Sequence, residues 1–188
     1  DPQQFIHYAR ERALQMIKED LALLDITFDR FFAESELIPD SVEAAIEALS
    51  AANAEQDGLV YKDPEDDRKK WLRLTSLGRP KDRVIVREDG SYTYRMPDIA
   101  YHIDKFERGY DLIVDVFGAD HLDTSRDVTA ALGALLGDDE VNERLRVVIH
   151  QFVTLLRDGG RTKMSTRTGN FVTMGELVED VGSADVTR

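Results

Sequence analysis

Cysteine is absent from the 188-residue chain, which excludes disulfide bonds and thiolate metal sites. This absence fits a reducing compartment, and we expect a cytoplasmic protein. Long apolar runs are missing too: none approaches the ~20 residues of a membrane-spanning helix, so we expect no membrane partner. The chain lacks a signal-peptide pattern and begins with Asp1-Pro2 rather than Met. We therefore expect a piece of a longer protein.

Basic residues are outnumbered, with 24 Lys and Arg against 37 Asp and Glu, which gives a formal net charge of −13. Non-specific nucleic-acid binding depends on phosphate neutralisation by Lys and Arg, so this balance argues against a general nucleic-acid coat. A local cationic site remains possible, because clefts focus electrostatic fields. Hydrophobic residues make up 42 % of the chain and aromatic residues 8 %, which is enough for a sizeable core.

Two helices are predicted in the first 58 residues. Apolar side chains recur every three or four residues across 2–24, after Asp1 and Pro2, which suit the cap and the first turn. A second helix is expected after Pro39, with Ser41 as its cap and its end at Asp57-Gly58. The side chains that it is expected to bury are Val42, Ala45, Ile46 and Leu49.

Residues 59–97 change character and indicate a small antiparallel β unit. The runs "WLRL", "RVIVRE" and "SYTYR" are short and β-like. Asp89-Gly90, between the last two, is a strong hairpin-turn signal.

Residues 98–188 alternate between helix and strand. Helices are predicted at 98–109, with Asp98 as cap, at 124–137 and at 173–182, where Thr173 and Glu176 form a capping box. Buried strands are predicted at 112–118 and 145–150. This order indicates an α/β fold with a parallel sheet and right-handed crossovers. Ligands of such sheets bind beyond the carboxyl ends of the strands.

One cationic stretch stands out near the end of this acidic chain. "RTKMSTRTGNF" (161–171) combines Lys163 and Arg167 with hydroxyl groups such as that of Ser165, and glycines lie on both sides. Mobile positive groups of this kind can close on a polyphosphate whose charge develops during reaction. The alternative is a solvated turn with incidental charge.

Several stretches resemble a known family. "KMSTR" is similar to the Lys-Met-Ser-Lys-Ser loop of class I aminoacyl-tRNA synthetases. "YRMPDIAYHIDKFERGYDLIVDVFGADH", "LLRDGGRTKMS" and "TGNFVTMGELVEDVG" narrow the resemblance to arginyl-tRNA synthetases. It implies a Rossmann-like class I catalytic core, with flanking helices and a small antiparallel β insertion. Residues 1–58 would then be a helical connective segment, and 98–188 the C-terminal half of the nucleotide-binding domain.

The resemblance also implies a second ATP-binding motif, His-x-Gly-His. None of the four histidines, His7, His102, His121 and His150, lies in that pattern. We therefore expect the second half of a catalytic domain, inactive alone. Two further departures concern the family's second loop lysine, where Thr166 stands, and its Gly-Tyr pair, where Asp123 and Thr124 stand. Thr124 has the alternative role of a helix cap.

Roles for individual residues follow from the resemblance. It implies arginine binding by Tyr94, Asp98, His121 and Asp120. It implies ATP binding by Gly118, Gln151, Lys163 and Met164. It implies catalytic roles for Lys163, Ser165 and Arg167.

The residues themselves leave other roles open. Asp98 suits a helix N-cap and Tyr94 a half-buried strand aromatic. Asp120 and His121 resemble half of a metal site, but two ligands alone are weak support and we expect no metal ligands. Gln151 suits a structural hydrogen bond equally well.

The resemblance implies an arginine–tRNA ligase with three partners, L-arginine, ATP (as its Mg²⁺ complex) and tRNA(Arg). We expect a monomer. The alternatives are a nucleotidyltransferase of the same fold that does not act on tRNA, and a non-catalytic paralogue. Lack of preference for arginine over lysine would favour the first alternative.

Overall fold

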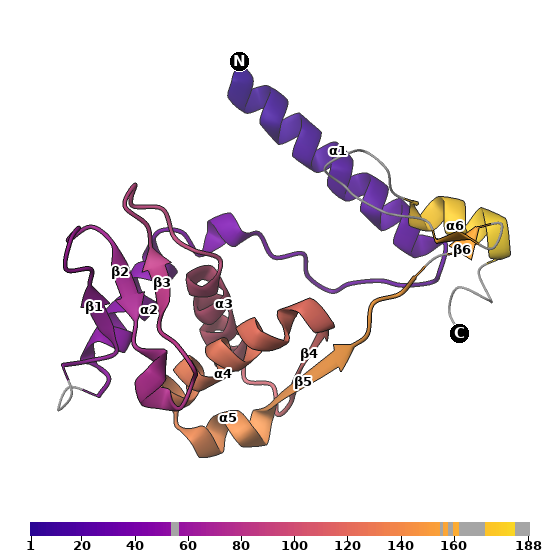
Figure 1. Ribbon diagram of the computed structural model, residues 1–188. Coiled ribbons are helices and arrows are strands. Elements are labelled where there is room, and N and C mark those ends of the chain that lie inside the picture. Colours follow the sequence, from indigo (N-terminus) through magenta and orange to yellow (C-terminus); the bar gives the residue numbers. More distant parts are fainter. Residues whose placement is uncertain (54–56, 155, 158–159, 162–171, 183–188) are drawn as a thin grey trace. The chain divides into compact units, whose positions relative to one another are not determined.

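Residues 1–53, 57–154, 156–157, 160–161 and 172–182 are described by a computed structural model (Figure 1). They fall into two units. One consists of Asp1–Phe31 and the described residues of Val153–Arg188, and the other is Phe32–Phe152. No helix in these ranges has both the length and the apolar character that a membrane span requires.

The first unit begins with α1 (Pro2–Ala22), close to the predicted range of 2–24. The Asp1 side chain accepts a hydrogen bond of 3.0 Å from the backbone N–H of Gln3, and Pro2 stands in the first turn. Both features confirm the predicted start of the helix. The first N–H groups of a helix have no partner within it, so a side-chain acceptor and a proline, which lacks an N–H, both suit this end.

The same unit contains two paired strands, β6 (Leu156–Arg157) and β7 (Gly160–Arg161), and the helix α6 (Met174–Val181). The predicted capping box is confirmed. The Thr173 backbone N–H donates to Glu176 Oε2 over 2.8 Å, and the Glu176 backbone N–H donates to Thr173 Oγ1 over 3.1 Å. These two bonds satisfy N–H groups that have no partner within the helix.

In the second unit, α2 (Asp40–Ala51) buries all four side chains predicted from its periodicity. Its ends differ from the prediction. Pro39 occupies the N-cap position and Ser41 lies inside the first turn, so Ser41 does not cap the helix. The helix ends at Ala51 because Ala52 turns extended, well before Gly58.

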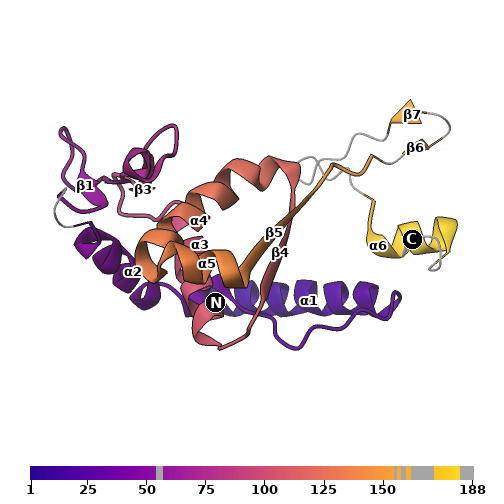
Figure 2. The same ribbon diagram turned by 90° about the horizontal axis from the view of Figure 1, so that it is seen from below.

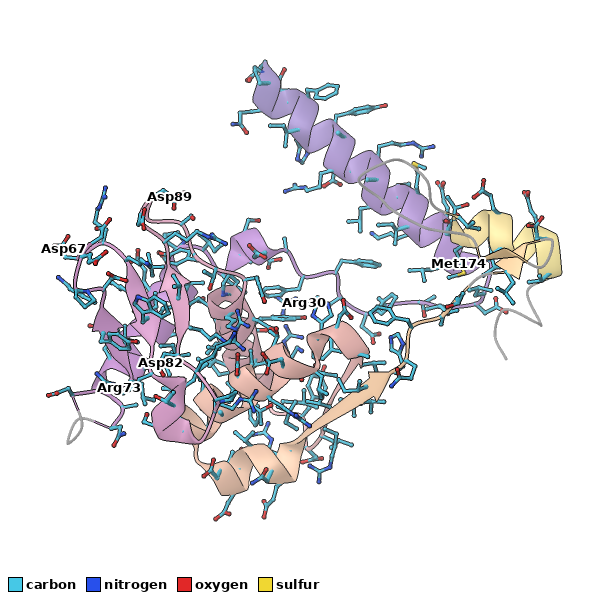
Figure 3. All side chains as sticks on the ribbon, in the orientation of Figure 1. Arg30, Asp67, Arg73, Asp82, Asp89 and Met174 are labelled. Atoms are coloured by element: carbon cyan, nitrogen blue, oxygen red, sulfur yellow. The ribbon has the colours of Figure 1, made fainter. Side chains whose placement is uncertain are left out.

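A small antiparallel sheet follows, as predicted. Its strands pair in the order β1 (Val60–Lys62), β2 (Lys70–Leu72) and β3 (Arg83–Val86). The turn at Asp89-Gly90 is confirmed, since the Gly90 backbone N–H donates to Arg87 O over 2.9 Å. Figure 3 labels Asp89, which lies in this turn. "SYTYR" does not form the expected strand: within it only Tyr92 makes an isolated bridge, to Val86.

The parallel pairing predicted for the last third of this unit is confirmed by β4 (Ile113–Gly118) and β5 (Leu145–His150), which lie side by side (Figure 2). Their residues alternate in burial: Ile113 is buried, whereas Val114 and Val116 are 51 % and 63 % exposed. The expectation of fully buried strands is therefore wrong for one face. Parallel sheets are usually covered on both faces, and the described residues cover only one.

Three helices complete the unit: α3 (Arg95–Glu107), α4 (Leu122–Leu136) and α5 (Asp138–Arg144). α3 packs against α2 and α4, and one continuous core joins these helices to both sheets. α4 begins two residues before the predicted 124–137, and α5 was not predicted. Gly118 and His150 are register partners, so the carboxyl ends of β4 and β5 meet at one edge.

Candidate active site

A cavity of about 330 Å³ lies in the second unit, near the carboxyl end of β4. Its wall combines aromatic, acidic and imidazole side chains from α3, from the short 3-10 turn Glu34–Glu36 and from the segment around the end of β4. The lining residues are Phe32, Glu34, Leu37, Tyr94, Pro97, Asp98, Tyr101, Phe117, His121 and Thr124. A cavity of this size suits a small ligand. The wall includes three of the four predicted arginine-binding residues, Tyr94, Asp98 and His121.

Asp98 is not the N-cap of α3. The helix begins at Arg95, and the Asp98 backbone N–H donates to Tyr94 O over 3.2 Å, as an interior helical residue does. The start lies upstream because Pro97 occupies the first turn, where its missing N–H costs nothing. The carboxylate of Asp98 is thus not used for capping. Its side chain is 30 % exposed and lines the cavity.

Tyr94 is the N-cap residue of α3 and is 58 % exposed. The expectation of a half-buried strand aromatic is therefore wrong. The guanidinium carbon of Arg95 lies 4.9 Å from the centre of the Tyr94 ring, a cation–π distance. The Tyr94 side chain lines the cavity.

The "GADH" segment forms a 3-10 turn, Ala119–His121, directly after β4. The rings of His121 and Phe117 stack with centres 5.8 Å apart, which places the imidazole in the cavity wall. Asp120 Oδ2 lies 3.7 Å from His121 Nε2, but Asp120 does not line the cavity. A Cβ on Gly118 would lie 2.7 Å from Asp120 Oδ1, so this close approach requires glycine or a shift of the Asp120 side chain.

Gln151 follows β5 directly and is exposed. Its backbone O lies 2.9 Å from His150 Nδ1. Since β4 and β5 are parallel, Gln151 lies at the same sheet edge as Gly118 but outside the cavity wall. The remaining predicted ATP-binding and catalytic residues lie outside the described residues: Lys163, Met164, Ser165 and Arg167.

Sequence reasoning missed several wall residues. Phe32 and Tyr101 stack with ring centres 4.6 Å apart, and Glu34 adds a second carboxylate. A signal existed for Tyr101, because it lies three residues after Asp98 and therefore on the same helical face. Phe32 and Glu34 precede any predicted element, and only the folded chain brings them to α3.

A buried cluster of charges lies next to the cavity. His102 is 2 % exposed, and its Nε2 lies 2.6 Å from Asp115 Oδ2. Burial acts to lower the pKa of His102, but hydrogen bonds with Asp115 and Asp98 outweigh it and raise the pKa to about 9. Burial acts to raise the pKa of Asp115, but hydrogen bonds from His102 and Lys105 hold it below its usual value.

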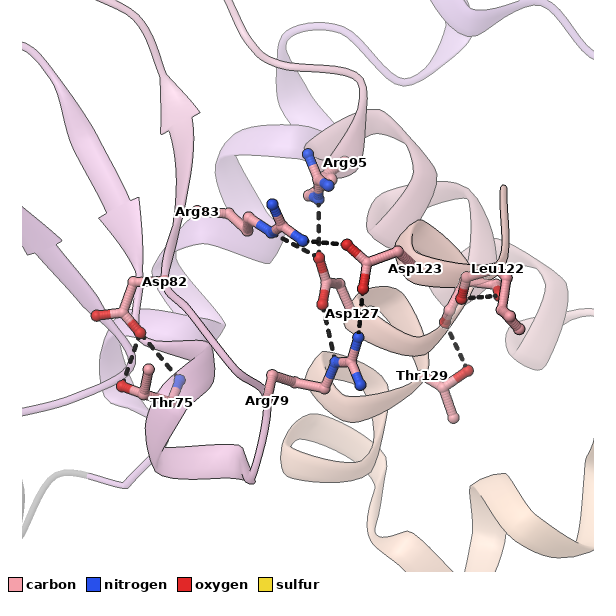
Figure 4. A network of polar contacts seen from close by, with 10 residues as sticks. Thr75, Arg79, Asp82, Arg83, Arg95, Leu122, Asp123, Asp127 and Thr129 are labelled. Atoms are coloured by element: carbon pink, nitrogen blue, oxygen red, sulfur yellow. Dashed lines mark hydrogen bonds and ion pairs between the residues drawn. The ribbon is translucent and has the colours of Figure 1, made fainter. Parts of the chain in front are cut away.

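The two residues that stand where the family has Gly-Tyr, Asp123 and Thr124, have definite places, whereas Thr166 lies outside the described residues. Thr124 lies inside α4, 8 % exposed, and lines the cavity, so it is not a cap. Asp123 accepts hydrogen bonds from Arg79, over 2.8 Å, and from Arg83 (Figure 4). The aspartate at position 123 therefore links α4 to the segment around β3.

Comparisons with known proteins agree with this geometry. A family model for the catalytic domain of class I tRNA synthetases (R) matches residues 3–185. The arginine–tRNA ligase of Desulfotalea psychrophila is 41 % identical over 189 residues, covering 100 % of this chain and 32 % of the relative. The corresponding enzyme of Chlorobium phaeobacteroides is 45 % identical over 174 residues, covering 92 % of this chain and 30 % of the relative. The chain thus spans about a third of the length of these curated relatives.

Solved structures also resemble this chain. The putative arginyl-tRNA synthetase of Campylobacter jejuni aligns with a TM-score of 0.77 at 35 % identity, over 94 % of this chain and 36 % of that one. The Thermus thermophilus arginyl-tRNA synthetase aligns with a TM-score of 0.68 at 17 % identity, over 91 % and 33 %, which supports the fold alone. The expected class I synthetase fold is confirmed, and the chain belongs to the class I tRNA synthetase (R) catalytic-domain family, that of the arginyl-tRNA synthetases.

Proposed function

We propose that this chain is part of the catalytic domain of an arginine–tRNA ligase, which activates L-arginine with ATP and transfers it to tRNA(Arg). The observation that carries the proposal is the cavity that combines the carboxylates of Glu34 and Asp98 with aromatic walls. A guanidinium is planar and presents five donors, two of which a carboxylate accepts side by side. The ammonium of lysine does not fill the same fork, so this wall favours arginine.

In this proposal the arginine lies against Tyr94, Asp98 and His121, with Asp120 beside His121. The backbone at Gly118 and the side chain of Gln151 belong to the ATP site at the carboxyl ends of the strands, with Lys163 and Met164. The parallel register that ends at Gly118 and His150 supports this division, because ligands of α/β sheets bind beyond that edge.

The chemistry has two steps. An oxygen of the arginine carboxylate attacks the α-phosphorus of ATP, the bond to pyrophosphate breaks, and arginyl-adenylate forms. A hydroxyl of the tRNA 3′-terminal ribose then attacks the adenylate carbonyl, and AMP leaves with the bonding electron pair. In our proposal, Lys163, Ser165 and Arg167 stabilise the negative charge that develops on the phosphates, so the protein contributes positioning and charge.

Mg²⁺ would enter with ATP. In the part of the chain that the structure describes, no group of three His, Asp or Glu side chains is arranged to hold a metal ion. We therefore assign no step to a protein-held metal.

We also propose a monomer that works in the cytoplasm. Light scattering from the full-length enzyme would test the first, and the cysteine-free sequence supports the second.

The test is Asp98→Asn in a full-length enzyme that carries this chain. The KM for arginine should rise about 10- to 100-fold, because a hydrogen bond to a charged group contributes about 1.5–3 kcal/mol. The KM for ATP should change little. Pyrophosphate exchange at varied arginine and varied ATP measures both constants.

Glu107→Gln is the matched control, since Glu107 lies on the same helix, is exposed and does not line the cavity. It should leave both constants near the wild-type values. An unchanged KM for arginine in Asp98→Asn would contradict the substrate role of this carboxylate. Activation of lysine as readily as arginine by the wild-type enzyme would contradict the function itself.

A further inference from the structure

Four charged groups, beginning with Asp98, form a chain of contacts that leads away from the cavity. His102 follows Asp98 by one helical turn, and its Nδ1 lies 2.7 Å from Asp98 O and 3.3 Å from Asp98 Oδ1. Its Nε2 lies 2.6 Å from Oδ2 of Asp115 on β4. The other oxygen of Asp115 accepts a hydrogen bond of 2.6 Å from Lys105 Nζ.

The partners of His102 determine its protonation. A backbone carbonyl and two carboxylates surround the ring nitrogens, and all of these oxygens only accept hydrogen bonds. A neutral imidazole has one N–H, so one of its nitrogens would direct a lone pair at an oxygen. Only the imidazolium, with two N–H groups, satisfies both sides. The raised pKa of His102, about 9, agrees with this count.

The imidazolium also suits a cavity that receives a cation. Asp115 lies between His102 and Lys105 and is only 6 % exposed, so its charge acts at short range on both. The positive charge of His102 is thereby offset rather than directed at the ligand. The ring of Tyr101 lies 6.5 Å from the imidazole, centre to centre, and is a further titratable group beside it.

We propose that His102 is a positioning residue: doubly protonated and held by Asp115, it fixes the carboxylate of Asp98 in the orientation that receives the guanidinium of the substrate. The inference rests on the proposed function, because it concerns the residue that would bind arginine. Asp115 acts through His102, and neither of these two residues lines the cavity. Contact with Asp98 Oδ1 leaves Oδ2 and the remaining lone pair of Oδ1 for the ligand.

Two amide substitutions of His102 distinguish a role in positioning Asp98 from a role in stability alone. In His102→Asn the amide nitrogen stands near the place of Nδ1 and keeps a donor for Asp98. In His102→Gln it reaches toward the place of Nε2 and keeps a donor for Asp115. The Gln variant fills more of the buried volume and satisfies the more buried carboxylate, so it should be the more stable of the two.

The kinetic constants should follow the opposite order. In the full-length enzyme, His102→Gln should raise the KM for arginine about 10-fold, the loss of one charge-assisted hydrogen bond, while His102→Asn stays within about 3-fold of wild type. The KM for ATP should stay within about 2-fold in both. A KM for arginine that follows the stability order, or that is unchanged in both variants, would overturn the proposal.

Asp98→Asn, measured alongside, distinguishes failure of the proposed arginine site from failure of the positioning role of His102. If it leaves the KM for arginine unchanged, the substrate site itself is wrong. If it raises that KM and the His102 variants do not behave as stated, only the positioning role fails. If neither His102 variant folds, ¹⁵N NMR of the histidines in the wild-type enzyme decides. Both ring nitrogens of His102 should carry protons at pH 7.5, with the signals assigned by replacing each other histidine of that enzyme in turn, and a neutral tautomer would overturn the proposal.

Discussion

Asp127 is the most heavily paired carboxylate among the described residues, and its neutralisation gives a sharp stability prediction. It is 1 % exposed and accepts hydrogen bonds from the Nε atoms of Arg79 and Arg83, both over 2.9 Å, and of Arg95, over 3.2 Å (Figure 4). Asp127→Asn replaces one oxygen by an NH2 group, so at least one guanidinium then faces a donor. In the wild-type chain two carboxylates, those of Asp123 and Asp127, face three arginines. In the variant only the carboxylate of Asp123 remains.

The magnitude follows from the burial of these groups. Removal of one partner from a buried ion pair costs about 3–5 kcal/mol. The three guanidinium groups are 12–16 % exposed and can rotate toward water, which favours the lower end of this range. We therefore expect Asp127→Asn to lower the free energy of unfolding by about 3 kcal/mol. With a urea slope of about 1–3 kcal/mol/M, the midpoint should fall by at least about 1 M.

Urea denaturation followed by Trp71 fluorescence measures the effect. Trp71 is the single tryptophan of the chain and lies on β2, so it reports the unit that contains Asp127. Asp104→Asn is the matched control: its side chain is 31 % exposed, its pair with Arg108 lies within one helical turn, and loss of that pair should cost only about 0.2–0.5 kcal/mol. Equal midpoint shifts in the two variants would refute the reasoning, because burial of the network would then contribute nothing.

Three further predictions concern other parts of the chain. His102 has its pKa raised from 6.5 to about 9, so its stabilisation, on the order of 3 kcal/mol, should be complete below pH ~6.5 and lost as the pH rises through 9; urea midpoints between pH 6 and 10 check this, and a flat profile would contradict it. Gly58→Ala should destabilise by more than the roughly 1–2 kcal/mol expected for Gly90→Ala, since both have positive φ but only at Gly58 would the new Cβ lie 2.2 Å from Ser50 O; equal losses in thermal unfolding would remove the clash as a cause. Lys163→Ala in the full-length enzyme should slow arginine activation roughly 100-fold in pyrophosphate exchange, and an unchanged rate would exclude its role toward phosphate.

The local patterns of this sequence predicted most elements of the fold. The buried face of α2 followed from its periodicity, and the turn at Gly90 followed from the Asp-Gly pair. The parallel pairing of β4 and β5 followed from a helix between two apolar strands. Each of these features follows from a local pattern or from the order of neighbouring elements, which is why one sequence was enough to predict it.

The errors had two sources, packing between separate elements and a local signal that was passed over. "LIVDVFG" was expected to be buried on both faces, yet Val116 is exposed because no described segment covers that side of the sheet. Asp98 was expected to be a cap because it precedes an apolar run, although Pro97 already suited the first turn. Asp115 drew no attention inside an apolar strand, since its partner His102 is set by the packing of α3 on β4.

The two carboxylates of the cavity, those of Asp98 and Glu34, have different surroundings. Asp98 belongs to a cluster with Asp115, His102 and Lys105, in which two carboxylates meet two cations. The cluster as a whole is therefore close to neutral, and Asp98 contributes a fixed acceptor rather than an excess of charge. Glu34 stands on an exposed 3-10 turn outside this cluster and adds a second carboxylate to the cavity wall, while the guanidinium groups of Arg95 and Arg108 lie over the wall rings of Tyr94 and Tyr101. A carboxylate held in one orientation can discriminate between a guanidinium and an ammonium, which carry equal charge, by the geometry of their donors.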